Sequence, residues 1–215
     1  MKQFEKYTEV EIIERILKGE KALYEIIVRR FNPYLYKVGR SYNYHHEDTL
    51  DLMQDTFVDA YKNLQNFEGR SNFKTWIVRI MLNNCYRKRE KASFKNEIME
   101  EAKEQATPMF AYTQGDTEKT IQNRELGHVI ETALNKIPLD YRMVFSLREI
   151  NGMNIEETAQ ALSITEANVK VRLNRAKAML RGEIEKIYSA NEVFEFNLIY
   201  CNAVVENVMK KINEL

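Results

Sequence analysis

Two clusters of basic side chains are the groups in this sequence best suited to bind a charged partner. Between residues 70 and 95, eight Lys and Arg accompany a single acid, Glu90, which leaves a net charge of +7. Between residues 168 and 182, five Lys and Arg stand without an acid. Because each neutralised phosphate releases condensed counterions, a polyanion is the natural partner of such clusters. A solvated helix face is the ordinary alternative, and composition alone leaves both open.

An acidic segment precedes the first basic cluster. Residues 45–60 contain five acids and neither Lys nor Arg. Four of the acids are spaced three, four and four residues apart, so a helix would align them in one stripe: Asp48, Asp51, Asp55 and Asp59. The stripe suits a basic partner surface, and Gln54 alongside it can add a hydrogen bond. Periodicity alone would favour a solvated helix face.

The second basic cluster lies in a segment with the pattern of a helix-turn-helix. Asn154 can cap a first short helix, with Glu157 completing a capping box. Residues 163–165 form a tight turn, and Thr165 can cap the second helix by accepting from the amide of Asn168. Apolar positions of that second helix are spaced by four, three and four residues and form one buried stripe: Val169, Leu173, Ala176 and Leu180.

The opposite side of this second helix carries long cations, an amide and small apolar groups, the mixture that reading base edges requires. Its members are Lys170, Val171, Asn174, Arg175, Ala178 and Arg181. Arg172 and Lys177 flank this face, where the phosphates of a duplex would lie. An αα-hairpin inside an ordinary bundle is the alternative, but a surface helix would normally intersperse acids, and this face has none.

The composition favours helices to position these groups. The 215 residues include only 7 Gly and 3 Pro, and 32 basic side chains balance 32 acidic ones. The two cysteines, Cys85 and Cys201, cannot form a disulfide scaffold, and no C-x-x-C pair exists for zinc or redox chemistry. No apolar run has the length of a signal peptide core or a membrane span, so we expect a cytoplasmic protein without membrane insertion.

Apolar residues recur at helical spacing along most of the chain, which predicts an all-α protein of two small helical domains. The first, residues 8–95, reads as about four helices, and the second, residues 121–187, contains the helix-turn-helix. Residues 96–120 read as a flexible acidic linker with little periodicity. Residues 188–215 read as a C-terminal amphipathic helix that packs on the second domain or docks an inhibitor.

Two stretches of the chain resemble one protein family. Residues 133–181, which read ALNKIPLDYRMVFSLREINGMNIEETAQALSITEANVKVRLNRAKAMLR, look like the C-terminal DNA-binding domain of the sigma-70 family, more narrowly its extracytoplasmic-function group. Residues 48–90, which read DTLDLMQDTFVDAYKNLQNFEGRSNFKTWIVRIMLNNCYRKRE, resemble that group's N-terminal domain, in the right order. The resemblance covers most of residues 8–187, and the linker stands where larger members carry a middle domain.

The resemblance implies a non-enzymatic protein without a cofactor. Such a protein binds core RNA polymerase, recognises two promoter boxes and melts the upstream edge of the start site, and it is a monomer when free. Family members are commonly held inactive by an anti-sigma factor, which is therefore a possible partner here. The helix matching residues 48–64 would dock on the polymerase through Asp48, Asp51, Gln54, Asp55 and Asp59.

The resemblance also assigns the promoter contacts. Ser71, Asn72 and Phe73 match the loop that holds unstacked bases of the downstream box, and a hydroxyl, an amide and a ring suit that task. Phe73 and Trp76 could instead be core residues, an interpretation that we favour for Trp76. The side chains expected along the single strand are Lys74, Arg79, Asn83, Arg87, Lys88 and Arg89.

The upstream box would be read as duplex by the second helix of the helix-turn-helix. Lys170, Asn174 and Arg175 are the expected base contacts, and Arg172, Lys177 and Arg181 are the expected phosphate contacts. The family often has a small polar residue in place of Val171 and an aromatic in place of Asn174. The sequence preference at the upstream box is therefore open.

Three other interpretations compete with this one. The main alternative is a helix-turn-helix regulator that binds a palindromic operator as a dimer. A helical adaptor that binds only proteins leaves both basic clusters unexplained. A metal site at residues 45–48, His-His-Glu-Asp, is disfavoured because di-metal carboxylate bundles need a repeated Glu-x-x-His motif on separate helices.

Overall fold

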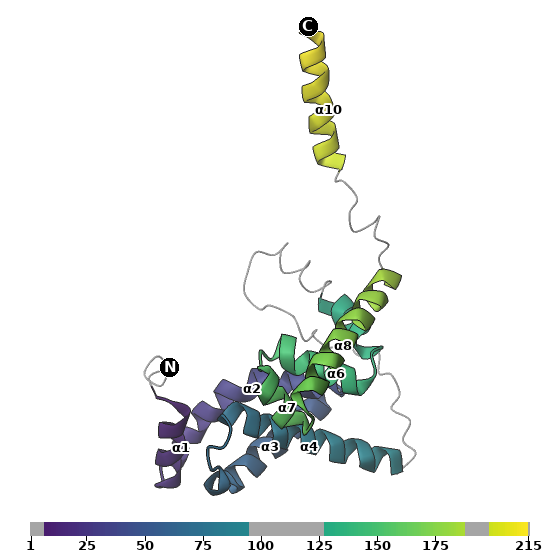
Figure 1. Cartoon of the computed structure of the whole chain (residues 1–215). Coiled ribbons are helices and arrows are strands. Elements are labelled where there is room, and N and C mark those ends of the chain that lie inside the picture. The colour runs from purple at the N-terminus through teal and green to yellow at the C-terminus, as the bar shows by residue number, and fades with distance from the viewer. Residues whose placement is uncertain (1–6, 95–126, 188–197, 215) are drawn as a thin grey trace.

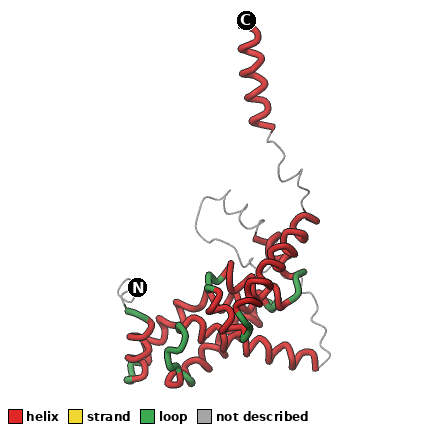
Figure 2. Tube along the Cα trace, viewed as in Figure 1, coloured by secondary structure: helices red, strands yellow, loops and turns green. Residues whose placement is uncertain are grey.

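A computed structural model describes residues 7–94, 127–187 and 198–214. Within these residues every regular element is helical, as Figure 2 shows, which confirms the expected all-α class. The segment expected to be a flexible linker, residues 96–120, lies outside the described residues. None of the described helices is both long and apolar enough to cross a bilayer.

The N-terminal domain is a bundle of four α-helices, as the apolar spacing predicts. Its helices are α1 (Glu9–Leu17), α2 (Tyr24–Ser41), α3 (His46–Lys62) and α4 (Phe73–Phe94), with short 3₁₀ turns η1 (Lys21–Leu23) and η2 (Leu64–Asn66). The fully buried side chains at their centre include Ile27, Phe31, Leu35, Phe73, Ile77 and Met81. Burying these apolar groups against one another is what holds the bundle together.

Helices α2 and α3 approach closely at one glycine. A Cβ atom at Gly39 would lie 2.6 Å from Cγ2 of Thr49 and 3.0 Å from Cε of Met81. Only a residue without a side chain allows this approach, which brings α3 and its acidic residues against α2.

The C-terminal domain begins with a helical segment at 127–135 and continues through four further elements. These are α6 (Leu139–Phe145), a π-helical turn η3 (Ser146–Ile150), α7 (Ile155–Leu162) and α8 (Glu166–Ile187). The sequence predicts one helix over 139–149, and the structure replaces its last turn by the wider π turn. Gly152 follows with φ +63°, which fits the turn expected at Asn151-Gly152.

The two domains pack directly against each other. Helix α7 lies on α4, and α2 contacts both α6 and η3, as the arrangement in Figure 1 shows. The core of the N-terminal bundle extends into the second domain through Met143, Leu147, Met153 and Ala161. Sequence periodicity indicated two domains but not this contact between them.

The C-terminal extension contains helix α10 (Leu198–Asn213). Five of its apolar side chains are about half exposed: Val204, Val205, Val208, Met209 and Ile212. In this conformation these five side chains of α10 are therefore not buried on the C-terminal domain, and packing there was one of the two roles expected for this helix.

Candidate nucleic-acid interface

The helix-turn-helix is built by local hydrogen bonds that the sequence predicts. The Asn154 side chain accepts from the Glu157 amide at 2.8 Å, and Oε2 of Glu157 accepts from the Asn154 amide at 2.7 Å. Ser163 ends α7 in the left-handed conformation, φ +54°. Thr165 Oγ1 then accepts from the Asn168 amide at 3.2 Å. This capped turn fixes the direction in which α8 leaves α7.

Helix α8 buries the expected stripe. Val169 and Ala176 are fully buried, and Leu180 is nearly so. Ile164, in the turn, packs with Leu173 on the small core around Val169. The opposite side is open to solvent and consists of Lys170, Val171, Asn174, Arg175, Lys177, Ala178 and Arg181. The residues that the sequence proposes for base reading therefore share one exposed face.

Acidic side chains pair with several cations of α8. Arg172 lies 3.5 Å from Asp140 at the start of α6, and Lys177 lies 2.9 Å from Glu149 in η3. Arg181 pairs with Glu185 one turn later, at 2.8 Å. Arg175 donates to the Tyr141 hydroxyl at 3.4 Å. Partly exposed pairs of this kind contribute little to stability, so a phosphate can replace the carboxylate.

The loop before α4 places the predicted downstream-box residues in three different environments. Ser71 is half-buried and Asn72 is exposed, but Phe73 is only 1% exposed. The Phe73 ring lies among Phe31, Phe67 and Trp76, with centroids 5.2–5.3 Å away. The Phe73 ring is therefore packed in the core in this conformation, which is the alternative that the sequence left open for it.

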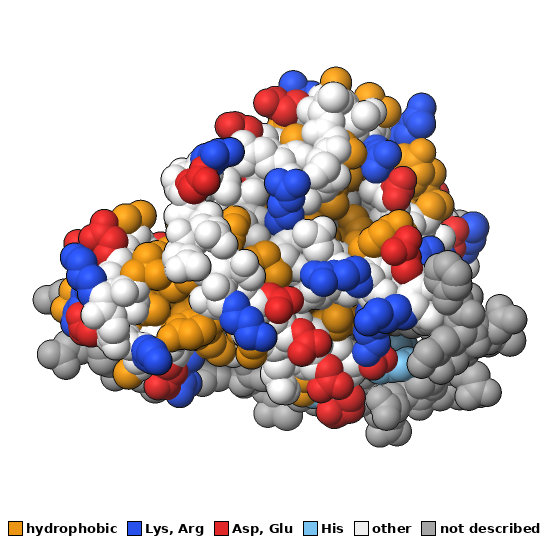
Figure 3. Space-filling model, turned by 90° about the horizontal axis from the view of Figure 1, so that it is seen from below, with side chains coloured by type: hydrophobic (Ala, Val, Ile, Leu, Met, Phe, Trp, Pro, Cys, Tyr) orange, Lys and Arg blue, Asp and Glu red, His pale blue; other side chains and the backbone are white. Residues whose placement is uncertain are grey.

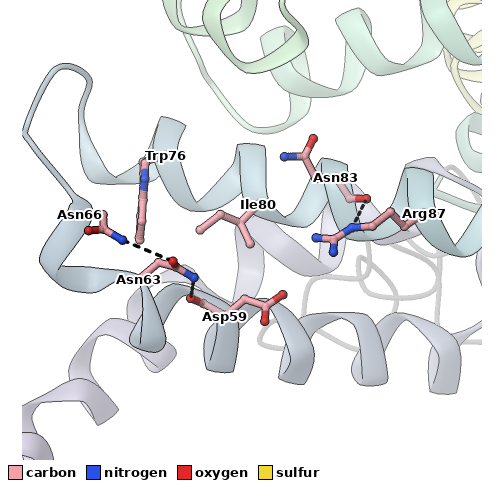
Figure 4. A pocket seen from close by; sticks show the side chains of 7 residues that line it. All are labelled: Asp59, Asn63, Asn66, Trp76, Ile80, Asn83 and Arg87. Carbon is pink, nitrogen blue, oxygen red and sulfur yellow. Dashed lines mark hydrogen bonds between the residues drawn. The ribbon is translucent and has the colours of Figure 1, made fainter.

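Trp76 is the more accessible of these two aromatic side chains. It is half-buried and lines a surface hollow of about 420 Å³ between α3, η2 and α4, shown in Figure 4. The sequence favoured a core role for Trp76. Of the three asparagines that line the hollow, it indicated only Asn83 as a candidate contact. The lining residues are Asp59, Asn63, Asn66, Trp76, Ile80, Asn83 and Arg87.

Asn63 and Asn66 are thus candidate contacts that sequence reasoning missed. They lie at η2, where Asn63 Nδ2 donates to the Asp59 carbonyl at 2.8 Å and Asn66 Nδ2 approaches Asn63 Oδ1 at 3.5 Å. The sequence does show these two asparagines three residues apart, shortly before the loop that contains Ser71 and Asn72. A tryptophan ring beside several amides can stack on a base and bond its edge.

Some basic side chains of α4 bind other residues of the same chain, and others are exposed. Arg79 and Asn83 are exposed, while Arg87 donates to Asn84 Oδ1 at 2.8 Å. Lys88 forms an ion pair with Asp48 of α3. On the face that Figure 3 shows, basic and acidic side chains are accordingly interspersed. The sequence placed Lys88 and Asp48 in two different sites, and the structure joins them.

The acidic stripe keeps its alignment on α3. Asp51, Gln54 and Asp55 are exposed, whereas Asp59 is half-buried and accepts from Asn84 Nδ2 at 3.2 Å. A groove of about 410 Å³ runs between this stripe and the basic residues of α4. The part of the stripe free to meet a partner is therefore Asp51, Gln54 and Asp55.

The loop before α4 also contacts the second domain. Asn72 Oδ1 accepts from the Thr75 amide at 2.7 Å and so caps α4, while Nδ2 of the same side chain donates to Glu157 of α7. Lys74 Nζ donates to the Asn151 carbonyl at 2.5 Å and lies 4.3 Å from the centre of the Tyr34 ring. Burial lowers the pKa of Lys74.

Among the residues that the structure describes, no group of three or more His, Cys, Asp or Glu is placed to hold a metal ion. His46, from the motif considered for a metal, has Nδ1 3.1 Å from the Tyr36 hydroxyl. The features that stand out are instead exposed basic and amide side chains around capped helix ends.

Comparison with known proteins matches both domains. Residues 27–94 match the family model described as sigma-70 region 2, and residues 128–180 match that described as sigma-70, region 4. The ECF RNA polymerase sigma-E factor of Haemophilus influenzae is 25% identical over 187 residues, covering 85% of this chain and 98% of that protein. The sigma-E factor of Escherichia coli K12 is 26% identical over 191 residues, covering 85% and 97%.

Solved structures share the fold. CnrH, in complex with the cytosolic domain of CnrY, has a TM-score of 0.59 and 23% identity, covering 81% of this chain and 96% of that chain. The sigma factor RpoE of Bartonella quintana, in complex with the anti-sigma factor NepR, has a TM-score of 0.60 and 22% identity, covering 75% and 96%.

Proposed function

The chain belongs to the extracytoplasmic-function group of the sigma-70 family, and we propose how its two domains divide the recognition of a promoter. It is a sigma factor that directs transcription initiation and is not an enzyme. The observation that carries the proposal is the capped α7–α8 unit, whose exposed α8 face combines cations with an amide. Its partners are core RNA polymerase and promoter DNA.

The upstream box is read as duplex DNA by α8. Lys170, Asn174 and Arg175 contact base edges in the major groove, where Arg and Lys suit guanine and Asn suits adenine. Val171 can touch a thymine methyl group. Arg172, Lys177 and Arg181 exchange their carboxylate partners for phosphates, which fixes the register of α8 on the duplex.

The downstream box is held as a single strand at the start of α4. Trp76 supplies the stacking surface, and Asn63, Asn66 and Asn83 supply hydrogen bonds around it. Ser71 and Asn72 border this site, and Lys74, Arg79, Arg87 and Lys88 follow the strand's phosphates. Phe73 supports the site from the core by packing against Trp76.

The acidic stripe of α3 docks on core RNA polymerase. Asp51, Gln54 and Asp55 are its exposed members, and their charge suits a basic partner surface. Asp48 and Asp59 lie at the two ends of the stripe. They join the contact when Asp48 releases Lys88 and Asp59 releases Asn84. Because the pairing is electrostatic, it should weaken as salt is raised.

An anti-sigma factor is a further proposed partner, and the free chain is proposed to be a monomer. The Bartonella quintana neighbour was solved with an anti-sigma factor, which supports the first point. The exposed apolar side of α10 is available to such an inhibitor. Removing residues 190–215 should then weaken inhibitor binding. If both the stability of the chain and inhibitor binding were unchanged, α10 would have no role in stability or in binding the inhibitor.

The proposal is tested by selecting genomic fragments of the host with the purified chain, with and without bacterial core RNA polymerase. We expect the chain alone to be a monomer that retains no fragment tightly. With core polymerase it should retain a few fragments that share two sequence boxes. A free dimer that by itself retains palindromic fragments, and that does not bind core polymerase, would favour the helix-turn-helix regulator.

A further inference from the structure

We infer that Tyr141 of α6 is a positioning residue for the upstream box, because its hydroxyl holds the Arg175 guanidinium in the orientation that reads a base. The inference rests on the proposed function of α8 and names a specificity-determining residue outside that helix. The contact that carries it is a hydrogen bond of 3.4 Å from Nη1 of Arg175 to the Tyr141 hydroxyl. This bond joins the exposed face of α8 to the first turn of α6.

The first support is that Arg175 differs from the other two proposed base contacts. Lys170 and Asn174 are exposed as well, but within the described residues neither side chain has a hydrogen-bond or ion-pair partner. A long side chain loses conformational freedom when it binds, and one that a neighbour already holds loses less. Arg175 is therefore the base contact that is ordered before DNA arrives.

The second support is that the Tyr141 hydroxyl is itself held in place. The Tyr141 ring packs on a small buried cluster of Ala133, Leu134, Ile137 and Leu180. Its amide donates to the Pro138 carbonyl at 3.0 Å, and α6 lies along α8, as Figure 1 shows. The ring thus fills the core while the hydroxyl reaches the surface, as is common for tyrosine.

The third support is a buried arginine next to Tyr141. Arg142 is only 8% exposed, and its Nη1 donates to the Asn135 carbonyl at 3.1 Å and to Asn135 Oδ1 at 3.2 Å. These bonds tie the first turn of α6 to the helical segment at 127–135. The turn that carries the Tyr141 hydroxyl is therefore joined to the helices on both sides of it.

The chemistry of two neighbouring acceptors on α6 separates the roles of two arginines on α8. The Asp140 carboxylate lies 3.5 Å from Arg172 and offsets its charge. The Tyr141 hydroxyl is neutral, so it orients Arg175 without offsetting the charge, and it takes one of five N–H donors. Two others can donate to O6 and N7 of a guanine, the bidentate contact that Arg favours in the major groove.

Tyr141→Phe tests the inference because it removes the hydroxyl and keeps the ring in the core. Fluorescence anisotropy measures binding of the holoenzyme to an upstream box from the selected fragments, and to boxes in which each base pair is changed in turn. Arg175→Ala identifies the base pair that Arg175 reads, because the preference should disappear there. Asp140→Asn, at the adjacent residue, is the matched control, since it releases Arg172 and not Arg175.

We expect Tyr141→Phe to reduce the preference at that base pair about three- to tenfold, because the freed side chain must be ordered during binding. The preferences at other base pairs and the slope of log K against log salt should not change, because no charge is lost. In an Arg175→Ala background, Tyr141→Phe should have no further effect. Asp140→Asn should change the affinity for all boxes alike.

Unchanged preferences in Tyr141→Phe, or an equal loss at every base pair, would overturn the inference, since the hydroxyl would then have no role or only a structural one. Preferences that survive Arg175→Ala at every base pair would also overturn it and leave the sigma-factor assignment intact. If the parent holoenzyme shows no preference among boxes, the proposed reading of the upstream box by α8 fails instead.

A measurement on the free chain decides the positioning without DNA. NMR relaxation of the Arg175 Nε–H group reports how far this side chain is ordered. The group should be ordered in the parent chain and in Asp140→Asn, and mobile in Tyr141→Phe. An Arg175 side chain that is as mobile in the parent as in Tyr141→Phe would overturn the inference, whatever the holoenzyme binds.

Discussion

Asn72 and Glu157 are hydrogen-bonded across 85 residues of sequence, and this contact joins the loop before α4 to the first helix of the helix-turn-helix. The same Glu157 carboxylate caps α7 through the Asn154 amide. One side chain therefore completes a local cap and a contact between domains. Only the cap could be foreseen, because its two residues are three positions apart.

The close approach of α2 and α3 makes Gly39 the position of the N-terminal domain where the smallest added group should matter most. Gly39→Ala should lower the free energy of unfolding by about 1–3 kcal/mol, because the new methyl group would collide with Thr49. Gly182→Ala is the matched control. It lies in α8 with nothing within 4 Å of an added Cβ, so it should stabilise by about 0.5–1 kcal/mol. Urea unfolding measures both, and equal effects would contradict this packing.

Much of the fold follows from short-range patterns in the sequence. The apolar stripe of α8 and its capped start at Thr165 appear as predicted, because each depends on residues within a few positions of one another. The contact between Ser41 and Ser146 spans 105 residues. No periodicity marks either serine, so the packing of the two domains could not be predicted from the sequence.

The candidate site was predictable in position but not in the direction of each side chain. Phe73 and Trp76 lie one turn apart, and either could have faced the core. The structure places Phe73 inward, against Phe31 and Phe67. Residues 168–182 contain no acid, but Arg172 and Lys177 find acidic partners on other elements, which the local sequence could not show.

The flanking cations of α8 should contribute affinity without sequence preference. Arg172→Ala and Lys177→Ala should weaken binding of the holoenzyme to all upstream boxes alike, and each should reduce the slope of log K against log salt by about 0.9. Asp140→Asn and Glu149→Gln are the matched controls, because they release the same cations and should strengthen binding. Fluorescence anisotropy over a salt series measures these slopes. A change confined to one box sequence would assign Arg172 or Lys177 to base reading.

Trp76 should supply the stacking surface for the downstream box. Trp76→Leu keeps an apolar side chain against Phe67 and Phe73 but removes the indole, so binding of single-stranded downstream DNA by the holoenzyme should weaken by about 1–3 kcal/mol. Tyr86→Ala, at an exposed position of the same helix outside the hollow, should have little effect. Equal losses for the two variants would exclude stacking on Trp76.

The buried Cys85 thiol gives a pH-dependent test of the N-terminal core. Burial raises the pKa of Cys85 to about 12 from its ordinary value of 9.0. The thiol therefore stays neutral in the fold, and the stability it contributes below pH 9 should be lost as the pH rises from 9 towards 12. In a Cys201→Ser variant, iodoacetamide at pH 8.5 should modify Cys85 only after unfolding in urea. Rapid labelling of the folded protein would show that this core is open.

Run-off transcription on one selected fragment tests whether the chain acts as a sigma factor, because it requires polymerase binding, both promoter boxes and DNA melting together. Core polymerase with the chain should start at one discrete site, core polymerase alone should not, and combining Lys170→Ala with Arg175→Ala should abolish the start. Absence of a discrete start with the unaltered chain, when core polymerase is active with another sigma factor, would show that the chain does not direct initiation.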